Sequence, residues 1–319
     1  MPRPNAPVDQ ASRRDPTAWE LAPLPPLLDL SAAEAFCRQV AAAHYENFTV
    51  ASRLLPAGLR QDFANVYTYA RWSDDLADES DGDATAALAA WRRGLERCFA
   101  GAADHPVFVA LGETVRRHDL SITPFTDLLD AFTQDQHVVR YESRADLLDY
   151  CRRSADPVGR IVLALAGCRD PGRVTLADAI CTGLQLVNFW QDIRRDRISG
   201  RIYLPAEDCR RHGVSEAMLD AERASPELIA LVADEVTWAR GLFDQGAPLV
   251  RTAPAVLRPA IGLFLAGGRG VATAIERAGF DTLARRPTLS RWAKGRLAVV
   301  AGLGMLRQRV SPWLGGGQS

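Results

Sequence analysis

The sequence of 319 residues contains very little lysine and no excess of positive charge. Lys294 is the only lysine, and 38 Lys and Arg residues face 39 Asp and Glu, so that the formal net charge is −1. Proteins that hold nucleic acid through a general electrostatic field carry a marked positive excess. The composition therefore argues against a global basic surface, and we expect no nucleic acid among the partners.

The six cysteines lack the spacings of common cysteine-based sites. None forms a Cys-x-x-Cys pair, and none stands at the spacing of zinc ligands. Reduced and mostly buried cysteines are typical of proteins from a reducing compartment. We therefore expect no zinc site, reduced cysteine side chains and a cytoplasmic location.

Long hydrophobic runs are missing as well. The N-terminus has no apolar stretch of the kind found in signal peptides, and the run from Leu297 to Leu306 is too short to cross a bilayer. The segment 285–309 nevertheless combines basic with apolar residues. Two interpretations of it stay open: a helix that lies peripherally on the inner face of the cell membrane, or an ordinary terminal packing helix.

Alternating strand patterns are absent too, whereas apolar residues recur with helical spacing along most of the chain. We predict one all-α domain over 29–310, between a disordered Pro-rich leader at 1–28 and a flexible tail at 311–319. Ser31 is the expected N-cap of the first helix. The predicted helices cover 31–44, 57–79, 84–100, 105–119, 124–137, 144–166, 173–198, 226–247, 254–277 and 289–308.

Two of the predicted helices carry a polar ridge that ends in two aspartates. The ridge on 57–79 consists of Tyr67, Arg71, Asp74 and Asp78. The ridge on 173–198 consists of Gln185, Asn188, Asp192 and Asp196. At about 100° of rotation per residue, the first set falls within an arc of roughly 60° and the second within roughly 80°. Each helix therefore presents one continuous polar face among apolar neighbours.

Buried polar groups need partners, and two facing ridges with cations between them would supply these partners. Mg²⁺ prefers oxygen ligands and is bound through one or two carboxylates plus substrate phosphates. We expect Arg71 to neutralise a leaving phosphate and Tyr67 to donate a hydrogen bond to it. The expected Mg²⁺ ligands are Asp74, Asp78, Asp192 and Asp196. The alternative is that both ridges are ion-pair networks that only hold helices together.

With these residues the sequence resembles the squalene and phytoene synthases. Their patterns Tyr-x-x-x-Arg-x-x-Asp-x-x-x-Asp and Gln-x-x-Asn-x-x-x-Asp-x-x-x-Asp are both complete here, and the resemblance runs from about residue 41 to 286. It is also carried by HYENFTVASRLLP at 44–56, YCRRSADPVGRI at 150–161 and GRIYLP at 200–205. The resemblance implies a helical bundle of the terpenoid synthase type with a central cavity, in which diphosphate leaves an apolar substrate.

The resemblance also assigns roles to individual residues. The implied catalytic residues are Tyr67, Arg71, Tyr150 and Asn188. The implied substrate-binding residues are His44, Phe48, Gln185, Tyr203 and Arg285. The residue that positions an attacking water is left open among Asp156, Asn188 and Tyr150.

Several residues depart from the common family pattern, and these departures indicate one branch of the family. Gln191 stands where many relatives have arginine, Arg195 where many have glutamate, and Ser-Ala-Asp-Pro-Val-Gly at 154–159 where Val-Ala-Gly-x-Val-Gly is usual. These features resemble the hydroxysqualene synthases of the hopanoid pathway. They imply that presqualene diphosphate loses diphosphate and that water captures the rearranged carbocation. The implied pathway partners are the enzymes that make presqualene diphosphate and reduce hydroxysqualene.

Three alternatives remain. The runner-up is a squalene or phytoene synthase that condenses two prenyl diphosphates head to head. The others are a non-catalytic assembly factor of the same superfamily, which would be expected to lose parts of the ridges, and a lipid-binding helical carrier. No dinucleotide fingerprint is present, so nicotinamide is not expected.

A few other residues receive structural interpretations. Gly267-Gly268-Arg269-Gly270 lacks the strand context of a phosphate loop and predicts close helix packing. Trp190 is predicted to lie in the core. His105, His118 and His212 are expected in loop-like or surface-like positions without metal-binding spacing.

Overall fold

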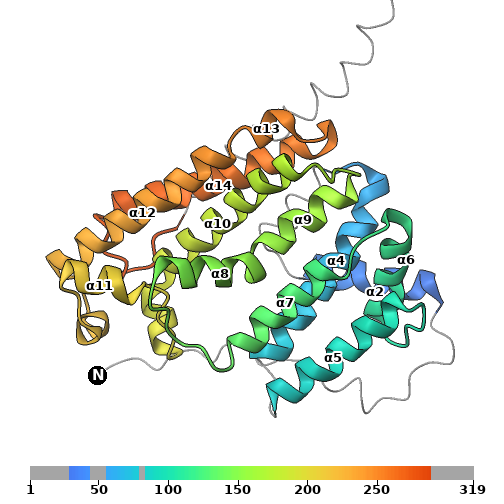
Figure 1. The fold of residues 1–319 in the computed structure, drawn as a ribbon, viewed down its shortest axis with the longest axis horizontal. Helices are drawn as coiled ribbons and strands as arrows, with labels where there is room; N and C mark the ends of the chain where they lie inside the picture. The colour runs from blue at the N-terminus through green and yellow to red at the C-terminus, as the bar shows by residue number, and fades with distance from the viewer. Residues whose placement is uncertain (1–28, 44–54, 79–82, 289–319) are drawn as a thin grey trace, which may run out of the picture.

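The computed structural model describes residues 29–43, 55–78 and 83–288, and these ranges are built of helices (Figure 1). The described ranges hold no strand, only an isolated parallel bridge between Arg140 and Ile202. The predicted all-α fold is confirmed, while the predicted leader, tail and C-terminal basic helix lie outside the described residues. The elements are α2 Leu30–Ala43, α4 Ala57–Asp78, α5 Ala84–Phe99, α6 Pro106–His118, α7 Thr123–Gln134, α8 Arg144–Ser154, α9 Asp156–Leu165, α10 Pro171–Ile198, α11 Ala206–His212, η2 Glu216–Asp220, α12 Pro226–Gly246, α13 Leu249–Thr252, η3 Ala255–Leu257 and α14 Arg258–Arg277.

Two helix boundaries differ from the prediction for identifiable reasons. The segment 144–166 was predicted as one helix, but it divides into α8 and α9 at Ala155. Pro157 has no N–H to donate to the carbonyl four residues earlier, and its ring would clash with that carbonyl, so α8 ends before it and Pro157 stands in the first turn of α9. Ser31 lies inside α2, and its N–H donates to Asp29 Oδ1 at 3.3 Å, which makes Asp29 the residue that caps α2.

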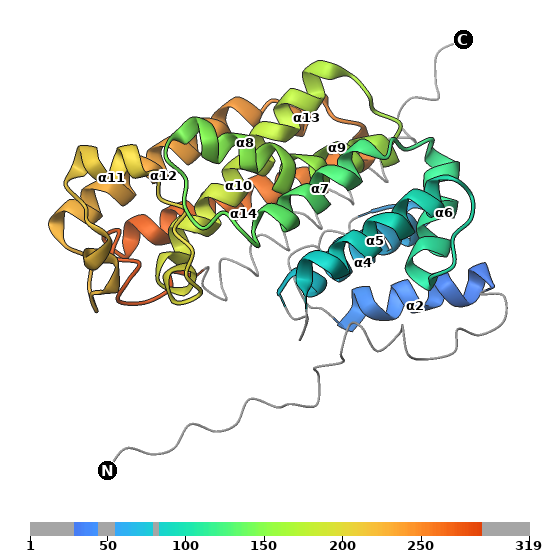
Figure 2. The same cartoon turned by 60° about the horizontal axis from the view of Figure 1, so that its bottom comes forward.

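The two ridge helices occupy the centres of two groups of helices. α10 packs against α8, α9, α12 and α14, and α4 packs against α2, α5, α6 and α7. Figures 1 and 2 show these groups at opposite ends of the molecule, and the two groups meet where α7 packs against α9. The Asp170 side chain caps α10 by accepting from the Arg173 N–H at 2.8 Å, and Gly200, with φ +82°, follows its last turn. These signals fix where α10, the helix that carries the second ridge, begins and ends.

The interior is apolar and contains few ionisable side chains. Trp190 is fully buried, as predicted, and all six cysteines are free thiols. His105 lies in the loop before α6, as predicted, but its side chain is buried and not on the surface, and its Nδ1 accepts from the Val107 N–H at 3.3 Å. Burial lowers the pKa of His105 to about 4. Histidine thus serves as an uncharged cap at this position.

One helical stretch, Ala255–Arg277, is long and apolar enough to cross a membrane by length and composition. In the described part of the chain it packs against α10, α12 and α13, as a helix of a bundle does. Gly268 permits this approach: a Cβ at this position would lie 2.4 Å from Phe243 Cζ and 2.8 Å from Leu184 Cδ2. The close helix packing predicted for the glycine-rich segment is confirmed there.

We expect Gly268→Ala to lower the free energy of unfolding by about 1–3 kcal/mol, because the added methyl group overpacks a filled interface. Gly267→Ala is a matched control, since nothing lies within 4 Å of a Cβ on Gly267 and alanine favours a helix over glycine. Thermal or urea unfolding measures both variants. Equal midpoints for the two would contradict the tight contact at Gly268.

Candidate active site

The ridge on α4 runs from a buried tyrosine to half-exposed carboxylates. Tyr67 is buried, whereas the side chains of Asp74 and Asp78 are 44% and 55% exposed. Arg71 lies between Tyr67 and the two carboxylates along the helix, and it pairs with Asp74 at 3.4 Å and with Asp75 at 2.5 Å. The charged end of the ridge therefore opens to solvent, and its arginine is already held by acidic neighbours.

The ridge on α10 shows a different gradient, because its carboxylates are less exposed than its amide. Gln185 is half-buried, Asn188 is exposed although its neighbours Phe189 and Trp190 are buried, and the Asp192 side chain is 17% exposed. An exposed amide on a central helix marks a face that the other described helices do not cover. The ridge thus presents its polar groups along an open side of α10.

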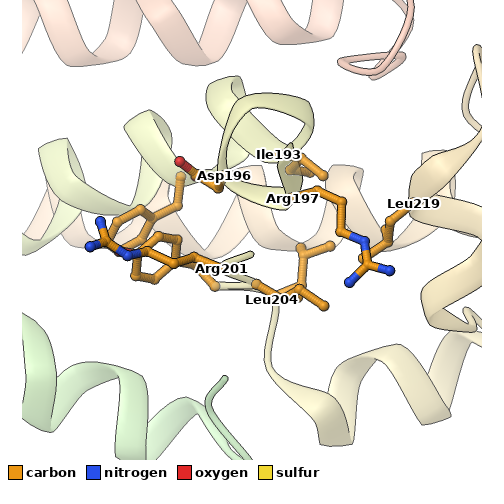
Figure 3. A pocket seen from close by; sticks show the side chains of 9 residues that line it. Ile193, Asp196, Arg197, Arg201, Leu204 and Leu219 are labelled. Atoms are coloured by element: carbon orange, nitrogen blue, oxygen red, sulfur yellow. The ribbon is translucent and has the colours of Figure 1, made fainter. Parts of the chain in front are cut away.

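Arg201 brings the ends of the two ridges together. Its guanidinium lies 3.5 Å from Asp78 Oδ1 of α4, and its charge also acts on Asp196 of α10. The turn that carries Arg201 is fixed by backbone hydrogen bonds from its own N–H to Asp196 O at 2.8 Å and from the Ile202 N–H to Val139 O at 2.8 Å. Figure 3 shows Asp196 and Arg201 beside the pocket between α10 and this turn.

The electrostatics at this end are those of an acidic site whose charges are only partly compensated by arginines. Burial, and after it the charge of Asp192, raises the pKa of Asp196 to about 7, and Arg201 offsets only part of this effect. Among the described residues no three His, Cys, Asp or Glu side chains converge on one point. Each ridge can still offer one or two carboxylates, which is the donor set that suits Mg²⁺ when phosphates complete its coordination. The residues therefore fit a divalent cation that is shared with a diphosphate.

Asp192 is held by Arg286, which donates to it through Nε to Oδ1 and through Nη2 to Oδ2 at 2.8 Å. The substrate-binding role implied for the neighbouring Arg285 stays a prediction. Arg286 Nη2 also donates to Gln191 Oε1 at 3.1 Å, and the Gln191 amide donates to Pro287 O. Gln191, which departs from the family pattern, therefore connects the segment after α14 to the second ridge by hydrogen bonds. The neighbouring Arg285 is exposed.

An aromatic wall adjoins the acidic end. Tyr203 stacks on Phe189 with ring centroids 3.8 Å apart and planes 7° apart, and Tyr150 lies 6.0 Å from Tyr203. Tyr141 packs on both Tyr150 and Tyr203 at 5.3 and 5.9 Å. Aromatic faces attract cations electrostatically. The structure thereby places the predicted Tyr150 and Tyr203 on one surface.

Asp135, at the C-cap of α7, belongs to this site although the sequence analysis did not select it. The Tyr150 hydroxyl donates to Asp135 Oδ2 at 2.8 Å. Burial raises the pKa of Asp135 to about 6, against the opposing effects of the Tyr150 hydrogen bond and Arg201. One signal was available: an acidic residue at the C-terminal end of a helix opposes the helix dipole and needs another reason to be there.

Other predicted residues lie elsewhere or are not described. Asp156 is buried between α9 and α10, where it accepts from Thr182 Oγ1 at 2.8 Å rather than from a ridge residue. His44 and Phe48 lie outside the described residues. The pocket in Figure 3 has a cavity volume of about 10 Å³, which is about enough to hold one water molecule. It is too small for a prenyl chain, so the predicted central cavity stays a prediction.

Comparison with known proteins assigns this arrangement to a family. The family model described as squalene/phytoene synthase matches residues 41–293, a span that includes both ridges, Arg201 and the aromatic wall. The chain belongs to the squalene/phytoene synthase family. The 15-cis-phytoene synthase of Synechococcus elongatus is 31% identical to this family member, over 84% of this chain and 92% of the relative.

Two further similarities concern squalene-type enzymes. Hydroxysqualene synthase of Zymomonas mobilis is 38% identical, over 56% of this chain and 61% of the relative. The crystal structure of squalene synthase HpnC from Alicyclobacillus acidocaldarius has a TM-score of 0.76 at 43% identity, and covers 79% of this chain and 95% of that chain. The predicted terpenoid synthase fold of this family member is thereby confirmed.

Proposed function

We propose that the protein is a hydroxysqualene synthase of squalene and hopanoid biosynthesis, which converts presqualene diphosphate and water into hydroxysqualene and diphosphate. The observation that carries the proposal is the junction at Arg201, where two acidic ridges meet beside an aromatic wall. The acidic end suits a cation-bound diphosphate, and the wall suits a carbocation. Similarity to the hydroxysqualene synthase of Z. mobilis and to squalene synthase HpnC supports the choice within the family.

The polar end has the groups needed to stabilise a departing diphosphate. The proposed cofactor is Mg²⁺, held by Asp74, Asp78, Asp192 and Asp196, and when bound it supplies positive charge to the leaving oxygens. Arg71 and Arg201 add guanidinium donors that suit phosphate oxygens. The diphosphate leaves with the electron pair of the broken C–O bond, so preorganised positive charge at this end lowers the barrier.

The aromatic wall acts on the other fragment. The ring faces that the Phe189–Tyr203 stack leaves uncovered would stabilise the cyclopropylcarbinyl cation and its rearranged forms by their electron density. Water then forms the new C–O bond and loses one proton, which gives the alcohol. No hydride is required, so the reaction needs no nicotinamide.

The cellular setting follows from the same chemistry. We propose a cytoplasmic enzyme that works peripherally at the inner face of the cell membrane, because its substrate and product partition into lipid. Its proposed partners are the enzymes that make presqualene diphosphate and that reduce hydroxysqualene. Fractionation of cells before and after a high-salt wash tests this location.

Chelation of divalent cations should abolish diphosphate release, and added Mg²⁺ should restore it. A second readout does not depend on turnover: Mg²⁺ with inorganic diphosphate should raise the unfolding temperature, since a ligand at about 100 times its Kd stabilises the native state by about 2.7 kcal/mol. Asp74→Asn and Asp192→Asn should lose this thermal shift. Asp149→Asn, which changes an exposed acid paired with Arg152 and Arg153, should keep it.

The decisive experiment is product analysis by mass spectrometry. Purified protein is incubated with Mg²⁺ and presqualene diphosphate, without NADPH, in water enriched in heavy oxygen. A triterpene alcohol that carries the heavy oxygen supports the proposal. If the protein leaves presqualene diphosphate intact or converts it without taking up oxygen from water, the proposal is wrong.

A second candidate function is head-to-head condensation of two prenyl diphosphates by a squalene or phytoene synthase. The specific observation in its favour is that several relatives that match over most of their length are phytoene synthases, at 31% and 32% identity for two of them. Incubation with farnesyl or geranylgeranyl diphosphate separates the two. Formation of a C30 or C40 hydrocarbon, without turnover of presqualene diphosphate to an alcohol, would establish this alternative.

A further inference from the structure

The pair formed by Asp135 and Tyr150 has no role in diphosphate binding as described above. The Tyr150 hydroxyl has one hydrogen, and it is donated to Asp135 Oδ2 at 2.8 Å. The phenol oxygen also forms a side-chain hydrogen bond with Tyr203, and since it has two lone pairs, one of them is left to accept a hydrogen bond from water. The ring cannot easily turn away, because Tyr141, Phe189 and Tyr203 pack around it at centroid distances of 5.3 to 6.3 Å.

Tyr150 alone is a poor proton acceptor. Burial raises its phenol pKa well above the ordinary value, so the side chain stays neutral. A neutral phenol can take up a proton only if it gives up its own at the same time. Asp135 is the group to which the structure connects that proton, and its other oxygen, Oδ1, is buried without a hydrogen-bond partner among the described residues.

We infer that Asp135 holds the Tyr150 hydroxyl in place and receives, through it, the proton released when water captures the carbocation. This inference rests on the proposed function. In the step, the water oxygen bonds to the cationic carbon and one water proton passes to the Tyr150 oxygen. The Tyr150 proton passes at the same time to Asp135 Oδ2. A carboxylate becomes a carboxylic acid, the phenol is regenerated and the product alcohol is neutral.

The surroundings of Asp135 favour this role over a purely structural one. Burial raises its pKa to about 6, which makes it a better proton acceptor than an exposed aspartate. Arg201, Asp78 and Tyr203 also lie close enough to act on this cluster electrostatically. Arg201 thus interacts electrostatically with both the acidic ridge and the Asp135–Tyr150 pair. The site of diphosphate release and the proposed proton acceptor therefore share one cation.

The test measures two products of the same reaction: diphosphate released and alcohol formed from presqualene diphosphate. Asp135→Asn keeps an oxygen that accepts from Tyr150 but cannot take up its proton. We expect diphosphate release within about tenfold of wild type, while the alcohol formed per diphosphate falls about 10²-fold, the usual size of a general-base contribution. Tyr150→Phe should cause the same loss of alcohol, and the double variant should lose no more than either single one.

Asp130→Asn is the matched control, because Asp130 lies on the same helix and pairs with the half-exposed Arg92 at 2.5 Å. It should leave the alcohol-to-diphosphate ratio unchanged. A wild-type ratio in Asp135→Asn or in Tyr150→Phe would overturn the inference, so either variant suffices if the other fails to fold. If the wild-type protein makes no alcohol at all, the proposed function falls, and the two failures are thereby distinguished.

Discussion

Replacement of Arg201 by alanine should lower the rate of diphosphate release from presqualene diphosphate by about 10²–10³-fold, as removal of a preorganised charge donor does in other enzymes. Arg201 lies 3.5 Å from Asp78 and acts on Asp196 and Asp135, so it is the cation that three acidic groups share. Without it, their mutual repulsion rises and the leaving oxygens lose a donor. Arg201→Lys should recover part of the rate, because it keeps the charge but not the planar fork.

Arg197→Ala controls for loss of an arginine from the same pocket. Figure 3 shows the Arg197 guanidinium on the side of the pocket opposite to that of Arg201. It pairs there with Asp220 at 2.7 Å, away from the two ridges. Steady-state kinetics of diphosphate release should show a near-normal kcat for this variant. Comparable losses in the Arg197 and Arg201 variants would mean that Arg201 contributes only general stability.

The raised pKa of Glu235 should make the protein lose stability as pH rises from about 5 to about 8, and replacement of Glu235 by glutamine should remove much of this loss. Glu235 is wholly buried on α12, next to Asp208 and 3.3 Å from Arg144. Burial, and after it the hydrogen bond with Asp208, raises the pKa of Glu235 to about 8, while Arg144 opposes the shift. Glutamine keeps a hydrogen-bond donor for Asp208 and carries no charge at any pH.

The direction follows from proton binding. The pKa of Glu235 is 4.5 in the unfolded chain and about 8 in the folded one. Between these values the folded state binds more protons than the unfolded state. The contribution of Glu235 to the free energy of unfolding is therefore fully present below pH 4.5 and is lost as pH rises through 8. The slope for one group is at most about 1.4 kcal/mol per pH unit. Asp156, Asp196 and Asp135 have raised pKa values too, so the difference between variant and wild type is the informative quantity.

Urea unfolding at pH 5 and pH 8 measures this difference. The substitution Glu235→Gln should leave stability near pH 5 almost unchanged and raise it at pH 8. Asp234→Asn changes the neighbouring exposed acid, which pairs with His212 at 2.9 Å, and should not alter the pH slope of unfolding in this way. A parallel pH dependence in wild type and Glu235→Gln would show that Asp208, not Glu235, carries the shared proton.

The polar ridges could be predicted because helical rotation alone decides which residues share a face. Tyr67 and Asp78 belong to one helix, and so do Gln185 and Asp196, so no knowledge of tertiary structure was needed. The wrong helix boundary at Ala155 also had a local cause, since Pro157 signalled a break that the apolar periodicity concealed. The residues that share a face could therefore be predicted from the sequence wherever a single helix carries the whole pattern.

The rest of the site comes from contacts between elements that are distant in sequence. Arg201, in the turn after α10, meets Asp78 at the end of α4, and Arg286 meets Asp192 across 94 residues. Asp135 and Tyr150 meet because α7 and α8 pack together, which no spacing in the sequence reveals. Arg285 and Arg286 are adjacent and carry the same side chain, so the sequence could not show that Arg286 pairs with Asp192; the path of the chain after α14 decides it.

The backbone pairing around the bridge between Arg140 and Ile202 constrains how this protein can change in length. The Ala206 N–H donates to Tyr141 O at 3.0 Å and the Glu207 N–H to Glu142 O at 3.0 Å, so the approach to α8 and the exit from α10 run side by side. An inserted or deleted residue in either stretch would shift Arg201 and Tyr203 relative to Tyr150. Loop grafts and insertions intended to alter this enzyme should therefore spare 139–142 and 200–207.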